Sequence, residues 1–110
     1  MQEFTDRQIE IMEAATNRIS KFGIQNLTIK TLAEDIGLSE PALYRHFKSK
    51  NQILWSLLEY FKTEMKNRIQ SIPFKPSTSE ADKLRAIFNS QLQTFVNKPA
   101  IVSVIFAESI

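Results

Sequence analysis

The chain has 110 residues, 43% of them hydrophobic, which suffices for one folded domain and at most part of a second. The lack of cysteine excludes disulfides, thiol catalysis and zinc fingers, and the N-terminal residues lack the basic start and apolar run of a secretory signal. With 14 Lys and Arg against 12 Asp and Glu, the net charge of +2 is too small to indicate a nucleic-acid partner by itself.

No apolar stretch is long enough to span a bilayer, so we expect a cytoplasmic protein without a membrane partner. The sequence contains no phosphate-cradling Gly-rich loop, nucleophile elbow or metal motif. His46 is the single histidine, which rules out a catalytic or metal-binding pair of imidazoles. We therefore expect no enzymatic activity, no cofactor and no metal.

The first predicted helix covers about residues 5–22. Its apolar residues recur at steps of three and four, which places them along one face: Ile9, Met12, Ala15, Ile19 and Phe22. Thr5 and Gln8 have the spacing of a capping box, and Gly23 is suited to the position after the last helical residue.

A shorter helix is predicted over residues 28–36. Its apolar positions are Ile29, Leu32, Ala33 and Ile36. Thr28 is the natural N-cap, and Gly37 can adopt the positive φ that a sharp turn between two helices needs. The small side chain of Ala33 would let the next helix cross closely.

The third predicted helix covers about residues 39–47. Ser39 is the better N-cap, yet Pro41 disfavours helical angles at Glu40, so Pro41 could instead be the first helical residue. Leu43 and Phe47, one turn apart, are the expected core contacts. The opposite face then carries Pro41, Arg45 and Lys48, flanked by Ala42 and Tyr44.

A long helix is predicted over about residues 50–70, with Ser49 and Gln52 forming a second capping box. Its wide apolar stripe consists of Ile53, Leu54, Leu57, Leu58, Phe61, Met65 and Ile69. Prolines then indicate a linker over residues 71–79. A fifth helix is predicted over residues 79–97, with an apolar side made of Ala81, Leu84, Ile87, Phe88, Leu92 and Phe95. Residues 100–110 are strongly apolar and indicate the start of a sixth helix.

Helix, Gly-containing turn and second helix at this spacing form a helix-turn-helix pattern. Other three-helix bundles share such stripes, so periodicity alone leaves a structural interpretation open. The sequence TIKTLAEDIGLS at residues 28–39, followed by ALYRHFKSK at residues 42–50, closely resembles the DNA-binding domain of the TetR family of bacterial transcriptional repressors. The resemblance covers about the first half of the chain.

This resemblance implies an all-α homodimer that binds a palindromic operator in double-stranded DNA and releases it when a small-molecule inducer binds. Residues 1–50 would be the helix-turn-helix domain. Residues 51–110 would hold the connecting helix and an incomplete C-terminal ligand and dimerisation domain. The chain departs from the family in ending before the helices that form the dimer, and residues beyond Ile53 are hard to match.

By family position, two groups of side chains would contact DNA. Phosphate contacts would come from Thr28, Tyr44, His46 and Lys50. Apart from the family positions, Lys30 could reach the DNA backbone from the second helix. Base edges would be approached by Ser39, Glu40, Pro41, Ala42 and Arg45.

Several of these residues have competing interpretations. Arg45 could contact a guanine or a phosphate equally well, and Glu40 could accept from a cytosine amino group or only stabilise a helix N-terminus. For Lys30, a solvated charge is slightly favoured. Trp55, off the main stripe of its helix, could pack against the first helix or against the missing part of the C-terminal domain, or it could be partly exposed, and a ligand contact is less favoured.

The function that we expect is a sequence-specific repressor associated with the nucleoid. The alternative is a DNA-tethered protein-interaction module that acts on another machine when bound to the chromosome. A plain helical interaction domain without DNA affinity is a third possibility, and DNA binding would separate it from the other two.

Overall fold

The computed structural model describes residues 3–105, and within this range the chain forms helices and no strands. The elements are α1 (Asp6–Phe22), a 3₁₀ turn (Ile24–Asn26), α2 (Ile29–Ile36), α3 (Glu40–Tyr44), α4 (Lys50–Gln70), α5 (Glu80–Asn97) and α6 (Ala100–Ile105). The expected all-α fold is confirmed. The part of the predicted sixth helix beyond residue 105 lies outside the described residues.

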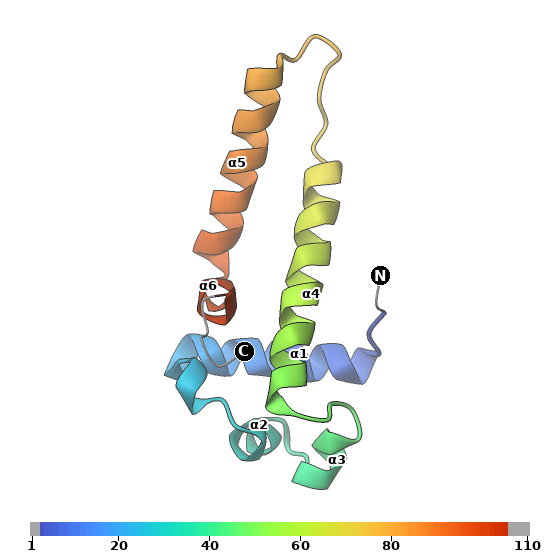
Figure 1. Ribbon diagram of the computed structural model, residues 1–110, viewed down its shortest axis with the longest axis vertical. Coiled ribbons are helices and arrows are strands. Elements are labelled where there is room, and N and C mark those ends of the chain that lie inside the picture. Colours follow the sequence, from blue (N-terminus) through green and yellow to red (C-terminus); the bar gives the residue numbers. More distant parts are fainter. Residues whose placement is uncertain (1–2, 106–110) are drawn as a thin grey trace.

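The molecule is elongated, with extents of 55 × 25 × 21 Å. Figure 1 shows α1, α2 and α3 gathered at one end, while α4 rises from them along the long axis. The chain turns over at the far end through the proline-containing segment, and α5 returns beside α4 to place α6 on α1 and α4. None of the helices in residues 3–105 is both long and apolar enough to cross a membrane.

Local capping interactions set the start of each long helix. The Thr5 hydroxyl accepts from the Gln8 amide at 3.1 Å, and the Gln8 side chain accepts from the Thr5 amide at 3.0 Å, so the predicted capping box is present. At α4 the Ser49 hydroxyl accepts from the Gln52 amide at 3.1 Å. The Gln52 side chain, however, accepts from the amide of Lys48 and not from that of Ser49, so the predicted second box is only half formed.

The hydrophobic core lies where α1 crosses α2, α4 and α6. Its fully buried side chains include Ile11, Met12, Leu27, Leu32, Leu43, Phe47, Ile53, Leu54, Leu57, Ile101 and Val104. Because α1 has neighbours on several sides, its buried face is wider than the predicted stripe and includes Ile11. Phe22 is wrongly assigned to that face: it is the last residue of α1 and 54% exposed, and the Arg18 guanidinium lies 4.6 Å from its ring centroid.

Most of the predicted apolar side of α5 stays outside this core. Phe95 is half-buried and packs against it, whereas Leu84, Phe88 and Leu92 are exposed, and the buried side chain of this helix is Thr94. Trp55 on α4 is 57% exposed, which agrees with the partly exposed alternative for that residue.

Candidate nucleic-acid interface

The segment α2–turn–α3 is built around three local features. Thr28 caps α2 by accepting from the Thr31 amide at 3.0 Å. Gly37 adopts the left-handed conformation, with φ 70° and ψ 28°, and the following Leu38 amide donates to the Ala33 carbonyl at 3.0 Å. A residue with a Cβ would be strained at this φ, which explains the glycine at the turn.

The third helix is held by its inner side. Leu43 and Phe47 are 0% and 1% exposed, which confirms both as core residues. Ser39 is the N-cap, accepting from the Ala42 amide at 3.2 Å, so Glu40 and not Pro41 is the first helical residue. Pro41 occupies the second position of the helix, where its missing N–H costs no helical hydrogen bond.

The helix is shorter than predicted, because α3 ends at Tyr44 and not near Phe47. The amides of Arg45 and His46 donate to carbonyls three residues back, at 3.2 and 3.0 Å, which tightens the chain into turns before α4 begins. Arg45 is therefore the C-cap of α3 rather than a residue inside it.

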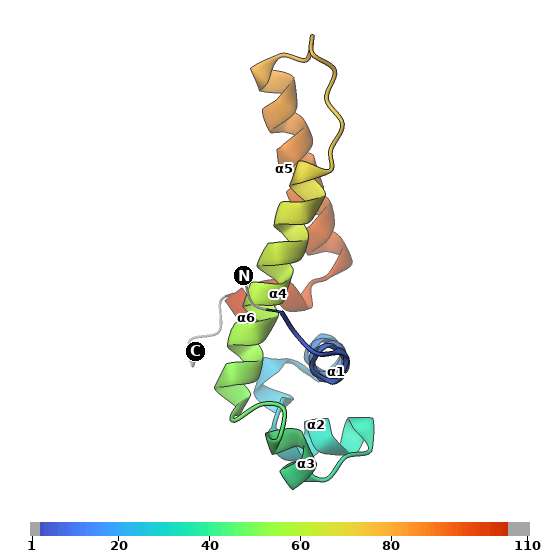
Figure 2. The same ribbon diagram turned by 90° about the vertical axis from the view of Figure 1, so that its right-hand side faces the viewer.

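The side of α3 that faces away from the core carries the residues expected to approach base edges. Exposed positions are Ser39, Glu40, Pro41 and Arg45, whereas Ala42 is half-buried. Figure 2 shows α3 beside α2 at the extreme end of the molecule, where the rest of the chain does not cover it. A rigid partner molecule could therefore contact this face of α3 without rearrangement of the core.

The residues expected to contact phosphates surround this face but come from different elements. Thr28 and Lys30 lie at the start of α2 and are exposed. Tyr44, 48% exposed, lies at the end of α3, and His46 and Lys50, both half-buried, flank the turn into α4. Lys50 is the first residue of α4, so its charge lies beside backbone N–H groups that are themselves suited to bind an anion.

The charges of this region favour an anionic partner more than the net charge of the chain suggests. Four cations lie between residues 28 and 50, namely Lys30, Arg45, Lys48 and Lys50, and none forms an ion pair with any residue between 3 and 105. Of the three carboxylates in the same stretch, Asp35 is neutralised by Arg18 of α1 at 3.1 Å. Lys48 is exposed and was not among the predicted contacts, although its position opposite Leu43 and Phe47 indicated it.

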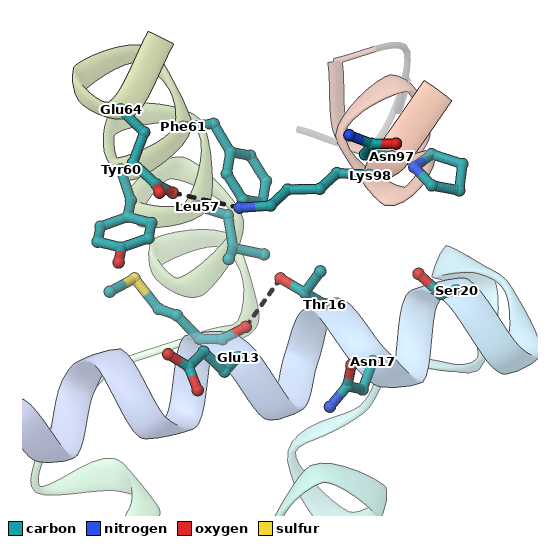
Figure 3. Close-up of a pocket in the computed structure, with 12 residues that line it drawn as sticks. Glu13, Thr16, Asn17, Ser20, Leu57, Tyr60, Phe61, Glu64, Asn97 and Lys98 are labelled. Carbon is teal, nitrogen blue, oxygen red and sulfur yellow. Dashed lines mark hydrogen bonds and ion pairs between the residues drawn. The ribbon is translucent and has the colours of Figure 1, made fainter. Parts of the chain in front are cut away.

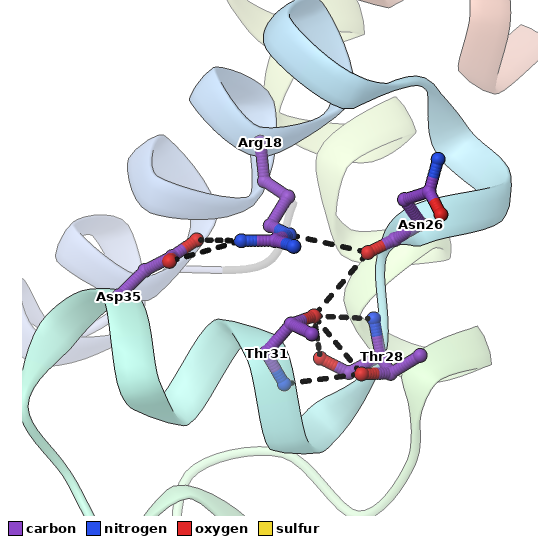
Figure 4. Close-up of polar contacts among 5 residues, drawn as sticks. All are labelled: Arg18, Asn26, Thr28, Thr31 and Asp35. Carbon is purple, nitrogen blue, oxygen red and sulfur yellow. Dashed lines mark hydrogen bonds and ion pairs between the residues drawn. The ribbon is translucent and has the colours of Figure 1, made fainter.

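Two side chains of α1, Arg18 and Gln8, fix the motif to α1 through contacts that the sequence did not indicate. Arg18 donates to both carboxylate oxygens of Asp35 and, through Nε, to the Asn26 carbonyl at 3.1 Å (Figure 4). It therefore joins α1 to the last turn of α2 and to the chain just before α2. Gln8 Nε2 donates to the His46 carbonyl at 3.1 Å and fixes the turn after α3. These contacts join residues far apart in the sequence, so no local pattern indicates them.

Residues 11–57 match the family of bacterial regulatory proteins described as the tetR family. The nucleoid occlusion factors SlmA of Yersinia enterocolitica and Yersinia pestis are each 40% identical to this chain over 68 residues, or 61% of the chain and 34% of the relative. The match thus spans about a third of the length of these curated relatives.

Two solved structures have a similar fold. The fatty acid degradation regulator FadR from Bacillus halodurans aligns with a TM-score of 0.81 and 20% identity over 97% of this chain and 56% of its own. A TetR-family transcriptional regulator from Haemophilus influenzae aligns with a TM-score of 0.69 and 17% identity over 89% of this chain and 53% of its own. At these identities the likeness concerns the fold alone.

Proposed function

We propose that the protein is a sequence-specific DNA-binding transcriptional regulator, because residues 11–57 match the tetR family of bacterial regulatory proteins. The observation that carries the proposal is the outer face of α3, which is anchored from behind by Leu43 and Phe47 and is left free at the end of the molecule. A helix of this size fits the major groove, where base pairs present distinct patterns of donors and acceptors.

In this proposal the side chains around α3 have separate tasks. Phosphate contacts set the position of the protein on DNA, and side chains at base edges provide the specificity. We assign the first task to Thr28, Lys30, Tyr44, His46 and Lys50, and the second to Ser39, Glu40, Pro41, Ala42 and Arg45. The position of Thr28 supports its assignment, because it is exposed at the N-terminus of α2, where backbone N–H groups and the positive end of the helix dipole favour an anion.

We further propose that the protein acts as a homodimeric repressor that a small molecule releases from a palindromic operator. Two copies of α3 would enter successive major grooves, about 34–36 Å apart. The course of α4 supports a mechanical link, since this one helix begins at the motif and rises from it along the long axis, beside α5. A ligand that binds beside α4 would change the separation of the two α3 helices.

The first test is DNA binding by full-length protein to sequences selected from random DNA. Lys50→Ala and Tyr44→Phe should weaken binding to selected and random DNA by similar factors, and Lys50→Ala should reduce the slope of log affinity against log salt by about 1. Arg45→Ala should instead lose about 1–3 kcal/mol of discrimination at one position if it contacts a base. Lys66→Ala, an exposed cation on the far half of α4, is the matched control.

Unchanged affinity in Lys50→Ala and Tyr44→Phe would overturn the phosphate assignments. Failure of the unmodified protein to enrich any sequence, even at low salt, would exclude sequence-specific regulation. An effect of Lys66→Ala equal to that of Lys50→Ala would mean that binding follows overall charge and not the α3 face.

A second candidate function is that of a DNA-tethered protein-interaction module. It is favoured by the 40% identity to relatives that are named nucleoid occlusion factors. In that case the chromosomal sites should lie without preference for promoters, and a protein partner should co-purify only when the selected DNA is present. Sites concentrated at promoters, with transcription changed on deletion, would support the regulator instead.

A further inference from the structure

A cavity of about 430 Å³ lies between α1, α4 and the corner that joins α5 to α6, on residues other than those of the α2–α3 motif (Figure 3). This volume is within the range of small-molecule sites in proteins, about 300–1,000 Å³. Apolar side chains form one part of the wall, chiefly Met12, Leu57 and Phe61. Two carboxylates, Glu13 from α1 and Glu64 from α4, lie on the same cavity.

A lysine from the corner, Lys98, provides the one cationic side chain of the cavity wall and contacts both an acid and a ring. Its Nζ lies 3.5 Å from Glu64 Oε1 and 5.9 Å from the centroid of the Phe61 ring. The first distance exceeds the roughly 2.7–2.9 Å of a good charge-assisted hydrogen bond, and the second is near the outer limit of about 6 Å for a cation–π contact. Both contacts of the Lys98 ammonium group, with Glu64 and with the Phe61 ring, are therefore longer than those of a strong interaction.

The carboxylate that Lys98 approaches is poorly satisfied. Glu64 Oε1 is inaccessible to solvent and accepts no hydrogen bond within residues 3–105, although 35% of the Glu64 side chain is exposed. A buried acceptor without a donor is costly, so a better-placed donor would bind there favourably.

The wall also carries an excess of negative charge. Glu13 forms no ion pair with any residue that the structure describes, which leaves two carboxylates against one ammonium group. Tyr60 lines the cavity beside them, and burial, followed by the carboxylates of Glu64 and Glu13, raises the pKa of its hydroxyl above the ordinary value of 10.0.

We propose that this cavity binds a small organic cation, an ammonium group on an aromatic or short aliphatic body, which displaces Lys98 Nζ from Glu64 and from the Phe61 ring. An acid and an aromatic face on one wall are the groups that recognise such a cation. The apolar wall of Met12 and Leu57 accommodates its body. The inference rests on the proposed function in that it names a chemical class for a ligand that binds beside α4, and it is tested without DNA, so that it can fail while DNA binding stands.

The test is a titration followed by ¹H–¹⁵N spectra of the backbone amides, with benzylammonium, benzyl alcohol and benzoate as probes of one shape and three charges. Benzylammonium should shift the amides of Lys98, Glu64 and Thr16 in a saturable way, and it should bind at least about tenfold more tightly than the other two.

Two variants and a control identify the site. Lys98→Ala removes the internal competitor and should tighten benzylammonium binding about threefold to tenfold, whereas Glu64→Gln should weaken it about tenfold. Lys66→Ala, a lysine on α4 that does not line this cavity, should leave it unchanged within about twofold.

Equal binding of the three probes, or weaker benzylammonium binding in Lys98→Ala, would overturn the proposal and make Lys98 a structural contact between the corner and α4. Shifts that map to residues other than those around Lys98 and Glu64 would also overturn it. Should Glu64→Gln fail to fold, the Lys98→Ala comparison still decides the question.

Discussion

The two ends of the molecule differ in how far they bury their apolar side chains. The base, which we define as α1 to α3 with α4 up to Phe61, supplies most of the buried core. The arm, which we define as residues 62–97, contributes no fully buried hydrophobic side chain to that core, although α5 carries Leu84, Phe88, Leu92 and Val96. Burial, not apolar composition, provides stabilisation, so the base and the arm should respond very differently to the same substitution.

The largest contrast is expected from a pair of leucine truncations on the two long helices. Leu54 in the base is 0% exposed and Leu84 in the arm is 67% exposed. Leu54→Ala should lower the free energy of unfolding by about 2–5 kcal/mol, because it leaves a cavity in the core. Leu84→Ala should change it by about 0.5 kcal/mol or less, since both residues are good helix formers and no cavity forms.

Urea denaturation followed by circular dichroism measures both changes under the same conditions. Comparable losses in the two variants would contradict the comparison, and they would mean that the exposed side of α5 is covered in solution. A loss confined to Leu54→Ala would establish the base as the unit that carries the stability.

The second contrast concerns two arginine–aspartate pairs. Arg18 lies 3.1 Å from Asp35 with 18% of its side chain exposed, whereas Arg85 lies 3.5 Å from Asp82 with 73% exposed. Arg18→Gln should cost about 1–2 kcal/mol, because the pair is partly shielded from water and Arg18 also binds the Asn26 carbonyl. Arg85→Gln should cost close to nothing, as is usual for exposed pairs within one helix.

Thermal and urea unfolding of both variants check this expectation, and Asp35→Asn completes a double-mutant cycle for the shielded pair. If the cycle gives no coupling between Arg18 and Asp35, the connection between α1 and α2 contributes nothing beyond its apolar contacts.

Local interactions can be predicted from the sequence, whereas those that depend on tertiary packing cannot. Helix starts at Thr5, Thr28, Ser39 and Ser49 follow from side chains that bind amides three residues away, so the sequence predicts them. The short α3 was not predicted, because its end depends on how Phe47 seats in the core and draws residues 45–47 into turns.

The two candidate sites differ in the same respect: one follows from a local pattern and the other from tertiary packing. The outer face of α3 follows from the periodicity of Leu43 and Phe47 together with the resemblance to a known domain. The cavity at Lys98 combines residues from α1, α4 and the α5–α6 corner, and their proximity is set by tertiary packing that no local pattern records. The apolar side of α5 was predicted correctly as a stripe, but periodicity does not tell whether a stripe is covered.

The smallest effect is expected where base and arm meet, at Tyr60. Its ring lies 6.2 Å from that of Phe4 and 6.4 Å from that of Phe61, between centroids. Burial, followed by the charges of Glu64 and Glu13, raises the pKa of its hydroxyl above 10.0 in the folded state. The unfolded chain loses this proton first, so the associated stabilisation is fully present below about pH 10 and is lost as pH rises through the folded pKa.

Tyr60→Phe should therefore flatten the fall of the unfolding free energy between about pH 9 and the raised pKa, because the ionising group is gone. Glu13→Gln should lie between Tyr60→Phe and the unmodified protein, since it removes the smallest of the three causes and leaves burial and Glu64 in place. Lysines titrate in the same range in every variant, so the differences between the curves carry the information. Urea denaturation at a series of pH values measures them, and an identical slope in all three proteins would mean that the pKa of Tyr60 is the same in the folded state as in the unfolded chain.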